Sequence, residues 1–333
     1  MNPSYTRRTF VKSITATALS LSLPDMPPRM LAPGKRVGII GLDTSHSTAF
    51  TKVLNASDAP ADYKGYRVVA AYPCGSKDIE SSASRIPGYS EEVKKAGVEL
   101  VNSIDELLGK VDVVLLETND GRLHLEQATQ VLKTGKRLFI DKPIAASLAD
   151  AVAIFKTAKK YNVPIFTSSS LRYIKGVEGL NKSQVLGADT FSPAKLEKTH
   201  PDLFWYGIHG VETLFTVMGR GCKQVVRVHT ENTDVVVGTW ADGRIGTFRG
   251  TRTGKAEYGG TVYGENGNVV LGPYMGYEPL LREIIHYFDT GITPVTPEET
   301  LEIFAFMEAA DESKRQGGVP IKLENVMSKV GRL

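Results

Sequence analysis

The feature that most constrains this chain is the alternation of short apolar segments with amphipathic ones in its first half. Residues 36–42, 66–72 and 111–116 are strongly apolar runs, as strands buried on both faces of a parallel sheet require. Helices are expected between them, as over residues 45–54 and 123–134. This alternation predicts βαβ units with right-handed crossovers, and hence a doubly wound, Rossmann-type parallel sheet. The other elements expected in this half are strands over residues 98–101, 137–140 and 163–168 and helices over residues 91–96, 103–108 and 148–161.

The pattern changes after about residue 170, where longer segments rich in Gly and Thr alternate in the manner of hairpins. Strands are expected over residues 225–229, 233–240, 245–251 and 258–263. Asp242-Gly243 is a turn signal between two of them. With two long helices expected over residues 277–290 and 297–316, this half is predicted to be an α+β domain with an open, largely antiparallel sheet. An open sheet face suits a second subunit, so a homodimer or homotetramer is expected.

The domain organisation that follows is a segment over residues 1–33, a Rossmann domain over 34–170 and an α+β domain over 171–333. The chain carries 40 basic and 37 acidic residues. Four of the basic and one of the acidic residues fall in the first 33, which leaves 36 of each sign in the body. A neutral body has no field that would attract phosphate polymers or anionic lipid, which argues against nucleic acid and the membrane surface as partners.

The first residues resemble the twin-arginine export signal of bacteria. Residues 6–12 read Thr-Arg-Arg-Thr-Phe-Val-Lys, and the apolar stretch behind them, residues 13–23, is much shorter than the ~20 residues of a membrane span. We expect this segment to bind the twin-arginine translocation machinery, and the mature protein to be periplasmic with no membrane span. A disordered basic tail is the alternative. Proteins exported by this route fold, and often load a cofactor, before they cross.

The turn after the first expected strand occupies the position of a dinucleotide-binding loop. Reading G-x-G-x-x-G from Gly41 places Asp43 and His46 at the second and third glycine positions, and a carboxylate there repels phosphate. Thr44, Ser45 and the helix N-terminus still offer hydroxyl and N–H donors to an anion. A doubly wound domain without a nucleotide is the alternative.

A lysine follows the expected strand over residues 137–140, in the sequence Leu-Phe-Ile-Asp-Lys-Pro that ends at residue 143. Open α/β sheets bind ligands at the carboxyl ends of their strands. A lysine enclosed by apolar walls loses basicity and can act as a base or hydrogen-bond donor near neutral pH. Lys142 is therefore a candidate catalytic residue.

This region resembles the glucose-fructose oxidoreductase and inositol dehydrogenase (Gfo/Idh/MocA) family. Its E-K-P motif supplies a lysine beside the nicotinamide, which Lys142 matches, while Asp141 shortens the acid. The resemblance implies that His124 is the family's histidine one helix earlier. It also implies that Arg172 lies at the domain crossover, and that the cofactor is NAD or NADP.

The resemblance continues into the second half, where Gly207-Ile208-His209 matches the end of the family's D-x-G-x-H motif. It implies that His209 is the active-site histidine, whereas the motif's aspartate is Trp205 here. Residues 200–206 also gather His200, Trp205 and Tyr206, and aromatic rings with polar tips suit sugar faces and hydroxyls.

The candidate site is thus predicted as follows. Catalytic residues are Lys142, His209 and Tyr206. Cofactor-binding residues are Gly41, Asp43, Thr44, Ser45, His46, Thr118, Asn119, His124, Asp141, Lys142 and Arg172. Substrate-binding residues are His200, Trp205, Tyr206 and Arg172. No metal ligand is predicted, because no carboxylate–histidine spacing indicates one; Asp43 and His46 with His200 or His209 are the alternative.

The function expected is that of an NAD(P)-dependent oxidoreductase that acts on a carbohydrate or polyol with a tightly retained cofactor. Oxidation of a hydroxyl to a ketone acidifies the neighbouring C–H. Elimination or hydrolysis followed by re-reduction would then give a redox-neutral reaction. The alternatives are a redox-silent sugar-binding protein on a Rossmann scaffold, and a lyase or isomerase that uses no nicotinamide.

Overall fold

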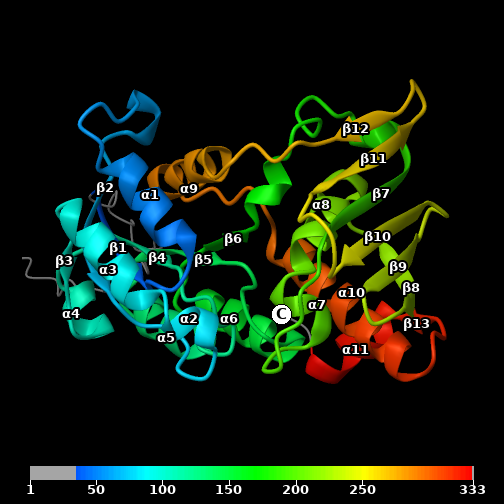
Figure 1. Ribbon diagram of the computed structural model, residues 1–333, viewed down its shortest axis with the longest axis horizontal. Helices are drawn as coiled ribbons and strands as arrows, with labels where there is room; N and C mark the ends of the chain where they lie inside the picture. Colours follow the sequence, from blue (N-terminus) through cyan, green and yellow to red (C-terminus); the bar gives the residue numbers. More distant parts are fainter. Residues whose placement is uncertain (1–34, 332–333) are drawn as a thin grey trace, which may run out of the picture. The chain divides into compact units, whose positions relative to one another are not determined.

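The computed structural model describes residues 35–331, so the twin-arginine segment lies outside the described residues. Two sheets with no common strand organise the described chain (Figure 1). The first is wholly parallel, with order β3-β2-β1-β4-β5-β6, and the second is a mixed, largely antiparallel sheet of order β12-β11-β7-β10-β9-β8-β13. The predicted fold class is confirmed.

The first sheet has the strand order of a doubly wound fold, in which the order reverses between β1 and β4. Its strands are β1 (Arg36–Ile40), β2 (Arg67–Tyr72), β3 (Glu99–Leu100), β4 (Val113–Leu116), β5 (Arg137–Asp141) and β6 (Ile165–Ser168). Its helices are α1 (Ser45–Leu54), α2 (Glu80–Ala83), α3 (Ile86–Lys95), α4 (Ile104–Leu108), α5 (His124–Leu132) and α6 (Leu148–Lys160), with a 3₁₀ turn, η1 (Ala61–Tyr63). All four residues of β4 are buried, as its unbroken apolar run predicts.

The second sheet begins after two 3₁₀ turns, η2 (Ser170–Tyr173) and η3 (Lys182–Gln184). Its strands are β7 (Val185–Pro193), β8 (Cys222–His229), β9 (Thr233–Trp240), β10 (Ile245–Thr251), β11 (Gly259–Gly264), β12 (Val269–Leu271) and β13 (Ile321–Lys322). The helices of this half are α7 (Asp202–Trp205), α8 (Ile208–Met218), α9 (Glu278–Thr290), α10 (Pro297–Arg315) and α11 (Leu323–Val330). Strand β7 was not predicted, because its sequence contains Gly, Asp and Pro in place of a β-branched run.

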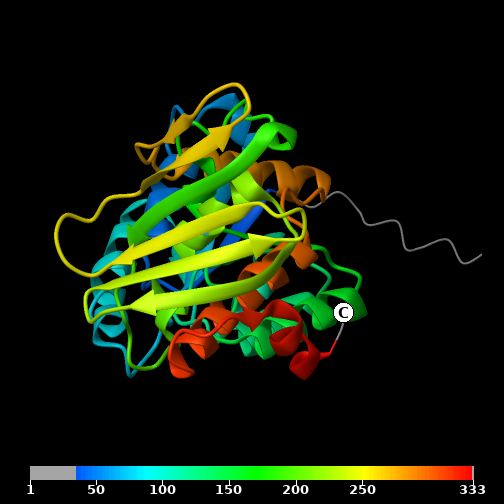
Figure 2. The same cartoon turned by 90° about the vertical axis from the view of Figure 1, so that its right-hand side faces the viewer.

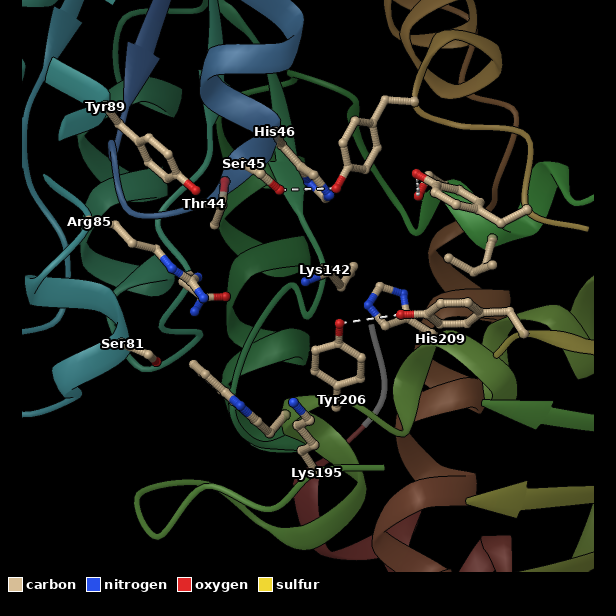
Figure 3. A pocket seen from close by; sticks show the side chains of 17 residues that line it. Thr44, Ser45, His46, Ser81, Arg85, Tyr89, Lys142, Lys195, Tyr206 and His209 are labelled. Atoms are coloured by element: carbon tan, nitrogen blue, oxygen red, sulfur yellow. Dashed lines mark hydrogen bonds between the residues drawn. The ribbon is translucent and has the colours of Figure 1, made fainter. Parts of the chain in front are cut away.

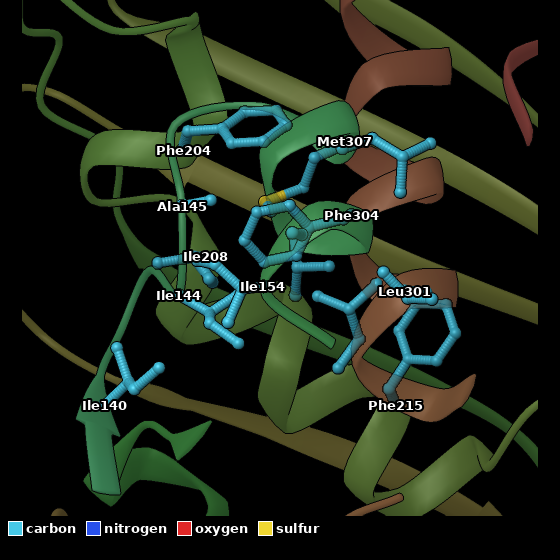
Figure 4. Close-up of a cluster of buried hydrophobic side chains, with 14 of the residues drawn as sticks. Ile140, Ile144, Ala145, Ile154, Phe204, Ile208, Phe215, Leu301, Phe304 and Met307 are labelled. Carbon is cyan, nitrogen blue, oxygen red and sulfur yellow. The ribbon is translucent and has the colours of Figure 1, made fainter. Parts of the chain in front are cut away.

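Helices α8 and α10 cover one face of the second sheet, and Figure 2 shows the other face with no described helix in front of it. Leu186, Ile245 and Val270 each expose more than half of their surface on these strands. Beneath the covered face lies an apolar core in which Phe204, Phe304 and their neighbours meet residues of the first domain such as Ile140 (Figure 4).

Helix α9 belongs by sequence to the second half but packs into the first domain. Its Leu281, Ile284 and Phe288 share one buried cluster with residues of the parallel sheet. The Tyr287 hydroxyl lies 3.2 Å from the Leu138 backbone nitrogen, which donates to it. Figure 1 shows α9 beside α1. The two sheets are therefore tied together by a helix that returns to the first.

No helix among the described residues combines the length and the apolarity that crossing a bilayer requires.

Candidate functional site

A cavity of about 370 Å³ lies where the carboxyl edge of the parallel sheet meets the second domain (Figure 3). Its lining includes one Arg, two Lys and two His side chains, and none of the described lining residues is acidic. The lining residues are Thr44, Ser45, His46, Ser81, Arg85, Tyr89, Asn119, Lys142, Ser170, Leu171, Lys195, Trp205, Tyr206, His209, Tyr258, Tyr274 and Tyr277. Such a cavity has the size and the position of a small-molecule site.

The turn from β1 into α1 forms one wall. Gly41 has φ +98°, and a Cβ there would meet the Thr118 backbone nitrogen at 2.4 Å, so only glycine fits. The next helix begins with no side-chain cap from Thr44, whose buried Oγ1 has no hydrogen-bond partner among the described residues. The uncapped first turn of α1 and this hydroxyl leave donors available to an anion.

Asp43 does not line the cavity, although sequence position places it at the phosphate-binding turn. Its fully buried carboxylate accepts from the Ser82 hydroxyl and, at 3.0 Å, from the Asn119 backbone N–H. A Cβ on Gly75 would lie 2.5 Å from the same carboxylate. Burial raises the pKa of Asp43. The carboxylate thus connects the segment after β2 to the turn. Because it points away from the cavity, it does not face a phosphate bound there.

The segment after β2 supplies lining residues that sequence reasoning missed. Ser81 comes from α2, and Arg85 and Tyr89 lie at the start of α3 and within it. Figure 3 shows Arg85 across the cavity from His209. In doubly wound folds this segment borders the ligand crevice. A basic residue within it could therefore have been predicted from the sequence to line the site.

Lys142 and His209 reach the cavity from the two domains (Figure 3). His209 Nδ1 lies 2.6 Å from the Ser169 hydroxyl oxygen. The other ring nitrogen, Nε2, is therefore available to a ligand. Burial, reinforced by the charge of Lys142, lowers the pKa of His209 well below its ordinary value. His209 is therefore a neutral imidazole near pH 7.

Aromatic rings surround His209. Tyr206 and Tyr258 contact its ring edge-on, with centroids 5.2 and 5.9 Å away, and the Tyr258 hydroxyl donates to that of Tyr206 at 3.2 Å. Trp205 also lines the cavity. Tyr274 and Tyr277 come from a loop far along the chain, and nothing near the predicted motifs signalled them.

Arg172 lies behind the cavity and outside its lining. Its guanidinium donates to Glu212 at 2.9 Å and to Glu299 at 2.6 Å. Glu212 in turn accepts from the Ser169 backbone N–H at 2.8 Å, and the Ser169 hydroxyl meets His209. Arg172 is thus placed to position the histidine through its neighbours, and it does not reach the substrate space that the sequence assigned to it.

Three further predicted residues also lie outside the lining. His124 is buried, with Nδ1 3.1 Å from the Ile144 carbonyl and Nε2 2.6 Å from that of Thr118. The Thr118 hydroxyl donates to the side chain of Gln127. His200 is buried, with Nε2 3.3 Å from a carboxylate oxygen of Asp120. These contacts stiffen the loop after β4 and its junction with the second domain.

Under the cavity floor, His46 faces two buried acids. Its Nδ1 lies 3.0 Å from Asp141 Oδ1 and 3.7 Å from Glu117 Oε2. Burial disfavours the charged form of His46, but Asp141 and Glu117 outweigh it and raise the pKa of His46. Burial raises the pKa of Glu117. The sequence analysis did not group these three residues, although Glu117 follows β4 just as Lys142 follows β5. The alternative pairing of His46 with Asp43 is wrong, since Asp43 makes its contacts elsewhere.

Residues 35–169 match the model of an oxidoreductase family with an NAD-binding Rossmann fold. That family is Gfo/Idh/MocA, and the match covers the first domain. The predicted NAD-binding type of domain is thereby confirmed.

Curated relatives match over short segments. The 1,5-anhydro-D-fructose reductase of Ensifer adhaerens is 33% identical over 97 residues, 28% of each chain. The glucose-6-phosphate 3-dehydrogenase of Bacillus subtilis is 26% identical over 146 residues, 43% of this chain and 36% of that one. The matched segments thus span little more than a third of these relatives at most.

Solved structures match over most of the chain. A probable dehydrogenase from Thermotoga maritima has a TM-score of 0.70 at 20% identity, covering 88% of this chain and all of that one. A myo-inositol dehydrogenase from Lactobacillus casei, solved with NAD(H) and myo-inositol, has a TM-score of 0.67 at 16% identity, covering 86% and 96%. At these identities the likeness shows the shared two-domain fold.

Proposed function

We propose that the protein is an NAD(P)-dependent oxidoreductase that acts on a carbohydrate or polyol. The observation that supports this most is one cavity that joins the uncapped N-terminus of α1 to Lys142, Tyr206 and His209. The names of the relatives, a sugar-phosphate dehydrogenase and an anhydrosugar reductase, agree with this substrate class.

The residues present fit a nicotinamide dinucleotide. The unpartnered Thr44 hydroxyl and the first turn of α1 offer donors to a pyrophosphate, and Arg85 adds positive charge nearby. Ser45 and Asn119 line the same wall. The Asp43 carboxylate does not oppose this, because it is buried and hydrogen-bonded away from the cavity.

When bound, the nicotinamide supplies hydride transfer to or from a substrate carbon. The chain's own residues handle the proton. A neutral His209, held through Nδ1, accepts a hydroxyl proton on its other nitrogen, and Lys142 donates a hydrogen bond to the same oxygen. Trp205, Tyr206 and Tyr258 provide the aromatic wall on which a sugar ring packs.

Retention of the cofactor and a redox-neutral reaction form the finer part of the proposal. The twin-arginine motif directs the folded protein to the periplasm, which supplies no free nicotinamide pool. A dehydrogenase that released its cofactor there would stop after one turnover. An enzyme that keeps the cofactor can oxidise a hydroxyl, carry out elimination or hydrolysis, and re-reduce the product. The exposed apolar residues of the second sheet support a homodimer or homotetramer.

The first experiment purifies the full chain, signal included, from the cytoplasm without added nucleotide, denatures it and identifies what is released. About one equivalent of NAD(H) or NADP(H) per chain is expected. Protein that is empty and also fails to bind added nucleotide would overturn the proposal in favour of a redox-silent sugar-binding protein or a nicotinamide-independent lyase. Arg85→Ala is expected to weaken nucleotide binding about tenfold, whereas Arg282→Ala, at an exposed position of α9, leaves it unchanged.

Once a substrate is known, Lys142→Ala is expected to lower kcat/KM by on the order of 100-fold or more, the usual contribution of a positioned proton-transfer group. Full turnover by this variant would reject the assignment of Lys142.

A further inference from the structure

The cluster of His46, Glu117 and Asp141 is assembled by the topology of the first sheet. His46 lies in the first turn of α1, Glu117 follows β4, and Asp141 ends β5. Since β1, β4 and β5 are neighbours and parallel, their carboxyl ends bring these side chains to one point. All three are buried, and the two carboxylates have no exposed surface. Imidazole and carboxylate thus converge directly beneath the cavity.

The polar atoms of this cluster lack hydrogen-bond partners in the part of the chain that the structure describes, and the Lys142 ammonium lies 3.8 Å from Asp141 Oδ2. His46 Nδ1 and both oxygens of Glu117 and of Asp141 have no hydrogen-bond partner within residues 35–331. The 3.0 Å approach of His46 to Asp141 is a contact without hydrogen-bond alignment. Buried carboxylates in this condition are destabilising unless a ligand satisfies them. Two carboxyl groups and one imidazole that face each other without a shared hydrogen bond are placed as ligands of a common centre.

The distances agree with such a centre. Ligand atoms about 2.1 Å from one metal ion, at tetrahedral or octahedral angles, lie roughly 3.0 to 3.5 Å apart. The two measured separations from His46 Nδ1 are 3.0 and 3.7 Å, and one ligand atom from each of the three residues lies within 4.8 Å of the others. Small shifts of the three side chains would bring one ligand atom of each to bonding distance from a single ion.

We propose that His46, Glu117 and Asp141 bind a divalent first-row transition-metal ion, such as Zn²⁺ or Mn²⁺, at the floor of the cavity. Two carboxylates match the charge of the ion, and the imidazole favours these metals over Ca²⁺ or Mg²⁺. Three protein ligands leave a coordination position open. His46 and the adjacent Lys142 both line the cavity, so the open position faces it. An oxygen of the substrate, a hydroxyl or carbonyl, is the ligand that this position would take.

This inference does not rest on the proposed redox function, because the residues that would hold the dinucleotide, Thr44, Ser45, Arg85 and Asn119, are different ones. Nucleotide release and metal content are separate measurements on the same sample. Failure of one leaves the other standing.

The test uses the untagged full chain. Its metal content is measured by mass spectrometry as purified, then Zn²⁺ and Mn²⁺ are titrated into chelator-treated protein by calorimetry. One ion per chain is expected. Glu117→Gln keeps the shape but removes the charged ligand. Because outer-shell partners alone are worth 10–100-fold in affinity, this loss is expected to weaken Zn²⁺ binding by about 100-fold or more. The matched control, Glu126→Gln at an exposed position of α5, makes the same chemical change and should bind as the wild type does.

Absence of one-site binding by the wild type would overturn the proposal, as would equal affinity in Glu117→Gln; the cluster would then be a buried ion-pair group neutralised by His46 and Lys142. Should Glu117→Gln fail to fold, X-ray absorption of the zinc-loaded wild type decides. A spectrum with one imidazole nitrogen and otherwise oxygen ligands supports the site, and one with sulfur or several imidazoles contradicts it.

Discussion

Two clusters of buried charge occur in this molecule, and they are built in opposite ways. In the second domain, fully buried Arg227 donates to Asp202, Asp234 and Asp311, and Asp234 also accepts from Arg252. These residues connect α7, β8, β9 and α10. Every acid of that cluster has a basic partner. The cluster under the cavity has two acids whose four oxygens lack aligned donors among the described residues.

The difference separates two reasons for burying charge. A cluster that satisfies itself can be explained by the connections it makes between elements. A cluster that does not satisfy itself costs stability, and it persists where a ligand or reaction requires it. Four perturbations test this contrast.

The largest effect is expected from breaking the satisfied cluster. Arg227→Ala removes the shared partner of the buried Asp234 and of the partly exposed Asp202 and Asp311, so the free energy of unfolding should fall by about 3–5 kcal/mol. Urea denaturation followed by circular dichroism measures this. A loss below about 1 kcal/mol would mean that the pairing contributes little and that the contrast is not one of stability.

The buried imidazole of His209 gives the next effect. Burial first, and then the charge of Lys142, lower the pKa of His209 in the folded protein. The unfolded chain therefore binds a proton below its ordinary pKa while the folded chain does not. Stability should fall by about 1.4 kcal/mol per pH unit below roughly pH 6 from this residue. The free energy of unfolding is measured from pH 7.5 to 5 for the wild type and for His209→Asn. The difference between their pH slopes gives the contribution of His209. His229→Asn, an exposed control, should keep the wild-type slope; identical slopes in all three would contradict the prediction.

Relief of the unsatisfied cluster should act in the opposite direction. In excess chelator, Glu117→Gln removes a buried carboxylate that accepts no hydrogen bond among the described residues, so the free energy of unfolding should rise by about 1–2 kcal/mol. Thermal denaturation of both proteins in chelator measures it. Destabilisation of similar size would show that Glu117 is satisfied in solution.

The smallest effect extends the comparison to exposed charge. Arg282 and Glu278 form a pair on α9 in which both side chains are more than half exposed. Arg282→Ala should change the free energy of unfolding by no more than about 0.5 kcal/mol. A change in the free energy of unfolding above about 1 kcal/mol would indicate that burial does not distinguish this exposed pair from the two buried clusters.

Local sequence signals predicted the elements of the first domain well. The expected helix over residues 45–54 coincides with α1, and the strand expected at residues 137–140 ends one residue before β5 does. Lys142 was found because a strand end is a known place for ligands, and it does line the cavity. The same rule applied to Glu117 would have found the second cluster.

Tertiary pairing accounts for what was missed. Arg172 was expected at the substrate, but its partners Glu212 and Glu299 come from α8 and α10, and no local pattern specifies that they meet. Tyr274 and Tyr277 reach the cavity from a loop more than a hundred residues beyond Lys142. Periodicity reports which face of a helix is apolar, and it does not report which neighbour covers that face.

The return of α9 to the first domain has a consequence for synthesis. The apolar cluster around Phe50, Phe139 and Phe166 includes Leu281 and Phe288 from α9. A nascent chain that has emerged only as far as β6 therefore leaves this surface uncovered. The ribosome must translate most of the second domain before the N-terminal one can close. During that interval the chain exposes apolar surface, and truncation before α9 would yield an aggregation-prone fragment rather than an independent nucleotide-binding module.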